Sequence, residues 1–139
     1  MNSILLNAAM GALVIPESKE NTMIICVDFD NTLSLGTRYP YIGKPNTELF
    51  SLLNSLQNLG HTLILWTCRE GEPLEEAIVW CKKNGLEFDY VNQNAPWLGF
   101  DCRKVVADWY IDDCAIHVSD IKTLKAIVRQ AELDNKYHS

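Results

Sequence analysis

The segment Met23–Thr32, which reads Met-Ile-Ile-Cys-Val-Asp-Phe-Asp-Asn-Thr, decides how the rest of the chain is interpreted. Its five consecutive apolar residues are typical of a strand buried on both faces of a parallel sheet, because a half-exposed strand alternates apolar with polar residues. Asp28 and Asp30 follow this strand, and open α/β sheets bind their ligands beyond the carboxyl ends of the strands. Two neighbouring carboxylates repel each other unless a positive charge lies beside them. The segment therefore predicts a cation site.

Composition limits the kind of protein to which such a site belongs. The chain has 139 residues, which is typical of one domain with its own core, and a formal net charge of −6. That charge argues against a general nucleic-acid-binding surface. The 5 cysteines are scattered, with no Cys-x-x-Cys spacing and no histidines that complete a ligand motif. This pattern indicates a reducing, cytoplasmic location without structural zinc.

Residues 1–21 are the least informative part of the sequence. They contain the apolar stretches Ile4–Leu6 and Met10–Ile15, but no Lys or Arg precedes these and neither is long enough to span a membrane. We expect no cleaved signal and no membrane partner. The segment is interpreted either as an N-terminal arm that packs on the domain or on a second subunit of a homo-oligomer, or as a frayed extension. Residues 22–139 are expected to form the folded domain.

A loop, a helix and a strand are predicted directly after the acidic pair. The Gly-, Thr-, Tyr- and Pro-rich stretch Thr32–Pro45 predicts a loop over the site. A leucine stripe with helical period predicts a helix capped by Asn46 or Thr47 and stopped by Gly60. The apolar run that follows predicts a strand that ends at Thr67.

The second half of the chain repeats this alternation. Pro73 predicts the start of a helix that ends at Gly85, and residues 88–91 predict a short strand. Residues 92–103 have no clear period and predict an irregular crossover. Residues 107–111 predict a fourth strand, which ends in an acidic pair. The final helix, from about Ser119, is expected to bury an apolar stripe formed by Ile121, Leu124, Ile127, Val128 and Ala131.

Polar residues thus gather around the ends of the predicted strands in a definite order. The order is a hydrophobic strand and Asp-x-Asp-x-Thr, a hydrophobic strand and Thr, a Lys, and a hydrophobic strand and Asp-Asp. Each element is weak alone, but the four in this order resemble the haloacid dehalogenase-like (HAD) superfamily of phosphohydrolases. The matching residues are Asp28, Asp30, Thr32, Thr67, Lys104, Asp112 and Asp113. Asn31 stands where that superfamily usually has glycine, and asparagine also tolerates turn geometry.

The resemblance implies an α/β fold with a doubly wound, Rossmann-like parallel sheet of order 3-2-1-4. The strand order reverses between strands one and four, which would bring Asp28 and Asp112 together. Neither the Thr32–Pro45 loop nor residues 70–103 leave room for a separate cap domain. The chain therefore resembles the small, cap-less branch of the superfamily.

The resemblance also implies an activity, that of a phosphatase that hydrolyses a phosphate monoester through an aspartyl-phosphate intermediate. Asp28 would be the nucleophile, and Asp30 would protonate the leaving oxygen and later deprotonate the attacking water. Thr67 would bind a phosphoryl oxygen, and Lys104 would bind substrate and balance its charge. Arg69, which leaves the second strand, is a further candidate for substrate contact.

The implied cofactor is Mg²⁺, which takes oxygen ligands and keeps several waters. Asp28, the backbone carbonyl of Asp30, and Asp112 would bind it, with Asp113 either a direct ligand or acting through water.

Three alternatives stay open. Lys82 and Lys83 compete with Lys104 as the site lysine, although cations are already favoured in the last turn of a helix. Phosphotransferases share Asp30, whereas dehalogenases need no acid there. A receiver domain carries its acidic pair on the first strand, which is the reverse of the order here. The substrate, whether a small molecule or a macromolecular phosphate, is not indicated by the sequence.

Overall fold

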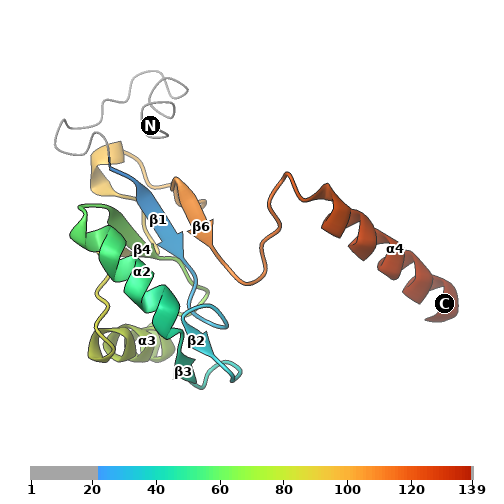
Figure 1. The fold of residues 1–139 in the computed structure, drawn as a ribbon, viewed down its shortest axis with the longest axis horizontal. Coiled ribbons are helices and arrows are strands. Elements are labelled where there is room, and N and C mark those ends of the chain that lie inside the picture. Colours follow the sequence, from blue (N-terminus) through green and yellow to red (C-terminus); the bar gives the residue numbers. More distant parts are fainter. Residues whose placement is uncertain (1–21, 139) are drawn as a thin grey trace.

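The computed structural model describes residues 22–138, which form an α/β domain followed by a separate C-terminal helix (Figure 1). The N-terminal arm expected at residues 1–21 lies outside the described residues, as does Ser139.

Four parallel strands form the central sheet: β1 (Ile24–Val27), β4 (Thr62–Leu65), β5 (Tyr90–Val91) and β6 (Trp109–Ile111). Their order across the sheet is β5-β4-β1-β6, and every neighbouring pair is parallel. All residues of β1 and β4 are buried, as expected for central strands covered on both faces. The four predicted strands are therefore present, each shorter than the run that predicted it.

Helices α2 (Thr47–Asn58) and α3 (Gly71–Lys83) cover one face of this sheet. Both begin and end close to where the sequence predicts. The Asn46 side chain caps α2 by accepting a hydrogen bond from the Leu49 N–H at 3.3 Å. Gly60 follows this helix with a φ of 96°, a conformation that glycine adopts without strain.

The core on this face contains fewer leucines than the helical stripe predicts. Phe50 and Leu53 of α2 and Ala77 and Cys81 of α3 are buried against β1 and β4. In contrast, Leu52 of α2 is 57% exposed, although it belongs to the predicted stripe. The leucine period therefore identified the helix correctly, but the buried face of the helix includes Phe50 and excludes Leu52.

The other face is covered by the crossover from β5 to β6, which contains one 3₁₀ helix, η2 (Pro96–Leu98). Its irregular backbone is held by the buried side chain of Asn94. The Asn94 amide accepts a hydrogen bond from the Val106 N–H at 2.7 Å and donates to the Cys102 carbonyl at 3.1 Å. An irregular segment can be buried because such side chains pair its polar backbone groups.

The stretch Thr32–Pro45, predicted as a loop, contains a small antiparallel hairpin of β2 (Ser34–Leu35) and β3 (Lys44–Pro45). The Ser34 hydroxyl accepts a hydrogen bond from the Gly43 N–H at 2.8 Å. The Leu35 carbonyl lies where a side chain at Gly43 would project, so this position requires glycine. The prediction of a loop is correct for residues 36–43 and missed the two short strands, because local pairing of two-residue strands leaves no periodic pattern in the sequence.

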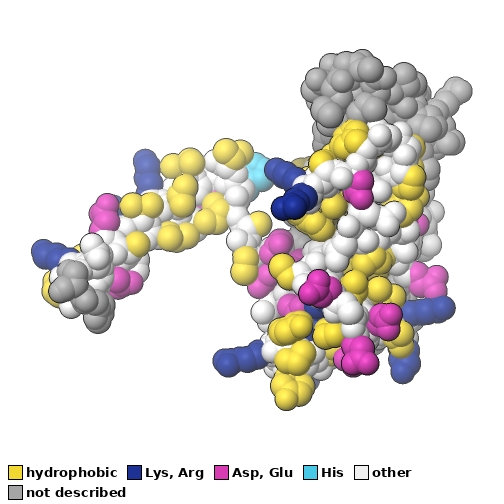
Figure 2. All heavy atoms as spheres, turned by 180° about the vertical axis from the view of Figure 1, so that it is seen from behind, with side chains coloured by type: hydrophobic (Ala, Val, Ile, Leu, Met, Phe, Trp, Pro, Cys, Tyr) yellow, Lys and Arg dark blue, Asp and Glu magenta, His cyan; other side chains and the backbone are white. Residues whose placement is uncertain are grey.

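Helix α4 (Ile121–His138) lies away from the sheet at the end of an extended linker (Figure 1). The prediction of a buried stripe is wrong here: Leu124, Ile127 and Val128 are 45 to 50% exposed, and Figure 2 shows apolar side chains uncovered along the helix. Helical period indicates which face is apolar but not what it packs against. Among the described helices, none combines the length and apolarity needed to cross a membrane.

Candidate functional site

Three carboxylates meet where β1 and β6 end. These strands pair in parallel with Val27 opposite Ile111, so the residues that follow each strand leave the sheet at the same edge. The Asp28 N–H donates to the Ile111 carbonyl at 2.9 Å, which continues the strand pairing by one residue. Asp112 and Asp113 follow Ile111 directly. This edge is also the topological switch point of the sheet, because the chain passes from β1 to β4 and β5 on one side and then crosses to β6 on the other side of β1.

The electrostatic environment of Asp28 favours the binding of a cation. Burial, together with the negative charges of Asp112 and Asp113 and a hydrogen-bonding contact with Asp113, raises the pKa of Asp28 to about 6. The Phe29 N–H, which hydrogen-bonds to the Asp28 carboxylate, opposes this rise. Within the described part of the chain, no cation is among the causes that act on this pKa. The raised pKa of Asp28 therefore reflects its burial and the repulsion from its acidic neighbours.

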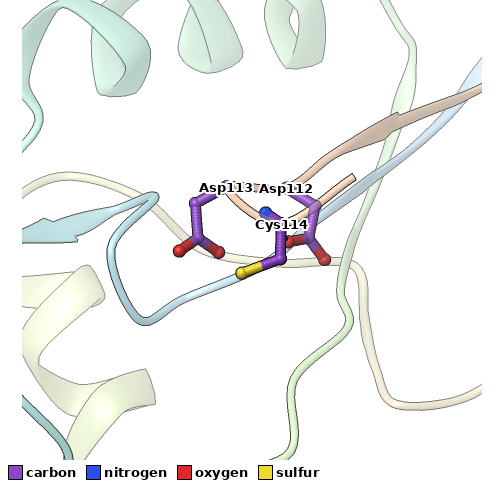
Figure 3. A group of neighbouring side chains, drawn as sticks. All are labelled: Asp112, Asp113 and Cys114. Atoms are coloured by element: carbon purple, nitrogen blue, oxygen red, sulfur yellow. Dashed lines mark hydrogen bonds between the residues drawn. The ribbon is translucent and has the colours of Figure 1, made fainter. Parts of the chain in front are cut away.

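Three donor atoms cluster after β6. One ligand atom each from Asp112, Asp113 and Cys114 can be chosen within 4.8 Å of one another, and Figure 3 shows the Cys114 sulfur between the two carboxylates. All three residues are exposed. The hydrogen-bonding contact with Asp113 and the negative charge of that carboxylate raise the pKa of the Cys114 thiol, which favours the uncharged form. Cys114 was not predicted as a site residue, and no sequence signal separates it from an ordinary buried cysteine.

A tight turn follows Asp28. The N–H groups of Thr32, Leu33 and Ser34 all donate to the Phe29 carbonyl, at 2.9 to 3.2 Å. Asn31 adopts a φ of 61° in this turn, which is the conformation that the glycine of the Asp-x-Asp-x-Thr pattern would adopt freely. Asparagine tolerates this conformation better than most residues, so the expectation about position 31 is confirmed.

The Thr32 hydroxyl is buried and has no hydrogen-bond partner among residues 22–138. A buried polar atom without a partner costs free energy, so such an atom beside a charged cluster indicates a missing ligand. Thr32 also lines a hollow next to the acidic cluster. The hollow is lined by Asn31, Thr32, Asn46, Glu48, Leu49, Leu52, Ile111, Asp112 and Asp113.

The Asp30 side chain is bound by Arg69. Its two carboxylate oxygens accept hydrogen bonds from Nε and Nη2 of Arg69, at 2.9 and 2.8 Å. The Arg69 side chain has no exposed surface, whereas that of Asp30 is 29% exposed. The expectation that Arg69 contacts substrate is corrected by this geometry, because a fully buried guanidinium engaged by a carboxylate has no surface to offer.

Thr67 lies where β4 leaves the sheet, next to the end of β1. Its N–H donates to the Asn92 side chain at 2.8 Å, and its hydroxyl accepts from the Arg69 N–H at 3.2 Å. Asn92, in turn, has a φ of 52° directly after β5. Asn92 was not predicted, but an asparagine directly after a strand is a recognisable signal for such a turn.

Lys104 is exposed, and its ammonium group lies 5.7 Å from the centroid of the Tyr110 ring. Within residues 22–138 it forms no ion pair. The alternative residue Lys82 pairs with Glu87 at 3.3 Å on the surface of α3. The structure therefore brings neither lysine into an ion pair with the acidic cluster, and the role of Lys104 stays a prediction.

Comparisons with known proteins give one structural match, whose description names no activity. No family model and no curated protein matches the chain. A solved structure, described as that of a conserved protein coded by a locus from Bacteroides thetaiotaomicron, is 39% identical in sequence with a TM-score of 0.62. The match covers 86% of this chain and 99% of that chain. The description of that protein states no activity.

Proposed function

We propose that this chain, which belongs to the same family as the conserved Bacteroides thetaiotaomicron protein, is a magnesium-dependent phosphatase of the HAD superfamily. The observation that carries the proposal is that Asp28, Asp112 and Asp113 converge at the switch point of the sheet, with Asp30 two residues after Asp28. The strand order supports the superfamily core as well. Numbered along the chain, the four parallel strands β5-β4-β1-β6 are 3-2-1-4.

The donor set fits Mg²⁺. Carboxylate oxygens are the ligands that this ion prefers, and Asp28, Asp112 and Asp113 supply them at one edge. The raised pKa of Asp28 reflects its burial and the negative charges of Asp112 and Asp113, which a cation would offset, and Thr32 lines the hollow that Asp112 and Asp113 also line. When bound, the ion would neutralise charge on the phosphoryl oxygens and on the carboxylates around them.

The residues of the chain account for both chemical steps. A carboxylate oxygen of Asp28 attacks phosphorus while the ester P–O bond breaks, and Asp30, which must enter this step in its protonated form, gives that proton to the departing alcohol oxygen. In the second step, Asp30 takes a proton from water as that water attacks phosphorus. The bond between phosphorus and Asp28 then breaks, which releases inorganic phosphate and restores both carboxyl groups. The Thr67 hydroxyl is suited to hydrogen-bond a phosphoryl oxygen from the neighbouring strand end.

The test is a panel of phosphate monoesters assayed with purified protein and Mg²⁺. We expect turnover of at least one ester by the wild type, and loss of that turnover in Asp28→Asn, which keeps the shape but lacks a good nucleophile. Denaturation midpoints of both proteins are measured in parallel so that unfolding is not mistaken for lost chemistry. Near-native activity of Asp28→Asn would refute the covalent mechanism, and an inactive wild type would refute the proposed function.

A further inference from the structure

The most buried charged residue of the domain lies next to the proposed acid and base. Arg69 is 1% exposed, and it follows Thr67 by two residues. Burial of a guanidinium group is strongly unfavourable unless it is paired and its donors are used. Arg69 meets this need through a two-pronged contact with Asp30, in which Nε donates to Oδ2 at 2.9 Å and Nη2 donates to Oδ1 at 2.8 Å.

The remaining donors of Arg69 bind the backbone on two sides. Nη2 also donates to the carbonyls of Pro40 and Tyr41, at 3.2 and 3.3 Å, and these residues lie in the turn of the hairpin. Nη1 donates to the Pro73 carbonyl, in the first turn of α3, at 3.2 Å. The guanidinium carbon lies 5.0 Å from the centroid of the Tyr39 ring. Arg69 therefore joins Asp30 to the hairpin and to α3.

This arrangement fixes where the Asp30 carboxylate can be. Both of its oxygens are held by one rigid, planar group, which is itself held by three carbonyls. Part of the Asp30 side chain stays exposed, whereas Arg69 has no exposed side-chain surface from which to touch a ligand. Any effect of Arg69 on chemistry must therefore pass through Asp30 or through the segments that Arg69 joins.

We propose that Arg69 is a positioning residue that holds Asp30 where it can transfer a proton to the leaving group and from the attacking water. The proposal rests on the proposed phosphatase function and adds to it a specific dependence. Proton transfer requires hydrogen-bond reach, so a carboxylate free to rotate loses much of its effect even when it is present. Lysine cannot replace this arginine, because it is a point charge without the two-pronged geometry.

The test compares two esters that differ in their need for an acid. p-Nitrophenyl phosphate has a good leaving group, whereas an alkyl phosphate has a poor one that must be protonated as it departs. In Arg69→Lys and Arg69→Met, we expect kcat/KM for the alkyl ester to fall on the order of a hundredfold, because general acid catalysis supplies about that factor or more. For p-nitrophenyl phosphate, kcat/KM should change only a few-fold. Because kcat/KM reports the steps up to phosphorylation, slow hydrolysis of the intermediate does not obscure the comparison.

Two further variants separate positioning from a purely structural role. In Asp30→Asn, the additional change Arg69→Met should have almost no further effect on kcat/KM for either ester, since its target is already absent. Arg129→Met, an exposed arginine on α4, is the matched control for removal of one positive charge and should behave as the wild type. Arg69→Lys keeps the buried charge and so provides a folded variant if Arg69→Met does not fold.

The outcomes are distinct. Equal losses for both esters in a folded Arg69 variant, or additive losses in the double variant, would overturn the positioning role while leaving the phosphatase function in place. A wild type that turns over no phosphate monoester of the panel, with Mg²⁺ present, would overturn the proposed function and this inference with it. A hundredfold loss confined to the alkyl ester is the result that the geometry of Arg69 and Asp30 predicts.

Discussion

Without metal, Asp28→Asn should make the protein more stable at neutral pH. The Asp28 carboxylate is half-buried beside two other carboxylates, so folding at pH 7 forces negative charges together. Asparagine has nearly the same shape and can still accept the Phe29 N–H, but it carries no charge. Residues of a functional site commonly destabilise the protein when no ligand is bound, because they are selected for activity and not for stability.

The size and sign follow from the pKa. The pKa of Asp28 rises from its ordinary 3.8 to about 6 on folding, mainly through burial and then through Asp112 and Asp113. Between these values the folded state binds more protons than the unfolded state, so stability falls as pH rises through this window. Two pKa units correspond to about 3 kcal/mol, which solvent screening of a half-exposed group reduces to about 1–2 kcal/mol. The variant's advantage should therefore be full above pH 7 and absent below pH 4.

The assay is urea unfolding in excess EDTA across pH 4 to 8, and at pH 7.5 we expect a gain of roughly 4–8 °C in parallel thermal scans. Glu75→Gln removes one exposed negative charge from α3 and serves as the control for net charge. Addition of Mg²⁺ should stabilise the wild type more than Asp28→Asn, because only the wild type has the full ligand set. An Asp28→Asn variant no more stable than the wild type at pH 7.5 in EDTA would contradict the reasoning.

The remaining predictions concern metal, intermediate and the buried hydroxyl. Activity should require Mg²⁺ and be inhibited by Ca²⁺, whose larger, less regular coordination lets a carboxylate bind with both oxygens and lose its line of attack; undiminished activity in EDTA would refute this. Asp30→Asn should accumulate a phosphorylated enzyme from p-nitrophenyl phosphate, seen as a burst of nitrophenol and a mass shift, and steady turnover without a burst would oppose it. Thr32→Val should raise the free energy of unfolding in urea by about 1 kcal/mol, because the buried Thr32 hydroxyl has no partner in the part of the chain that the structure describes, and it should lower activity. Ser34→Ala should lower the free energy of unfolding by about as much, because the Ser34 hydroxyl accepts from the Gly43 N–H. A Thr32→Val variant as destabilised as Ser34→Ala would mean that the fold itself needs the Thr32 hydroxyl.

Much of the fold could be predicted because its strongest signals are local. The unbroken apolar runs of β1 and β4 require burial on both faces, and helix limits follow from backbone groups that Asn46 and Gly60 satisfy. The hairpin could not be predicted in this way. Its strands are two residues long, and they are held by tertiary hydrogen bonds such as that between Gly43 and Ser34.

The residues of the candidate site also differ in how well local sequence signals predict their location. Asp28, Asp112 and Thr67 were predicted to converge because each follows an apolar run read as a strand, and parallel strand ends share one edge. Lys104 follows no strand, so its location depends on an irregular crossover whose path the sequence does not encode locally. In the structure, that path leaves its ammonium group over the Tyr110 ring.

Arg69 shows why a charged residue is hard to interpret from sequence. Its charge suggested contact with substrate, whereas the structure buries its side chain. A sequence shows that an arginine leaves the second strand, but not that a carboxylate and three carbonyls from elsewhere converge on it. The partners come from segments 28 to 39 residues earlier and from α3, and each contact alone is ordinary. Only their sum makes burial of the charge tolerable, since an arginine with any of these donors unpaired would favour water. A charged residue next to a predicted catalytic group therefore has two possible roles, and the number of its donors that the fold itself satisfies distinguishes them.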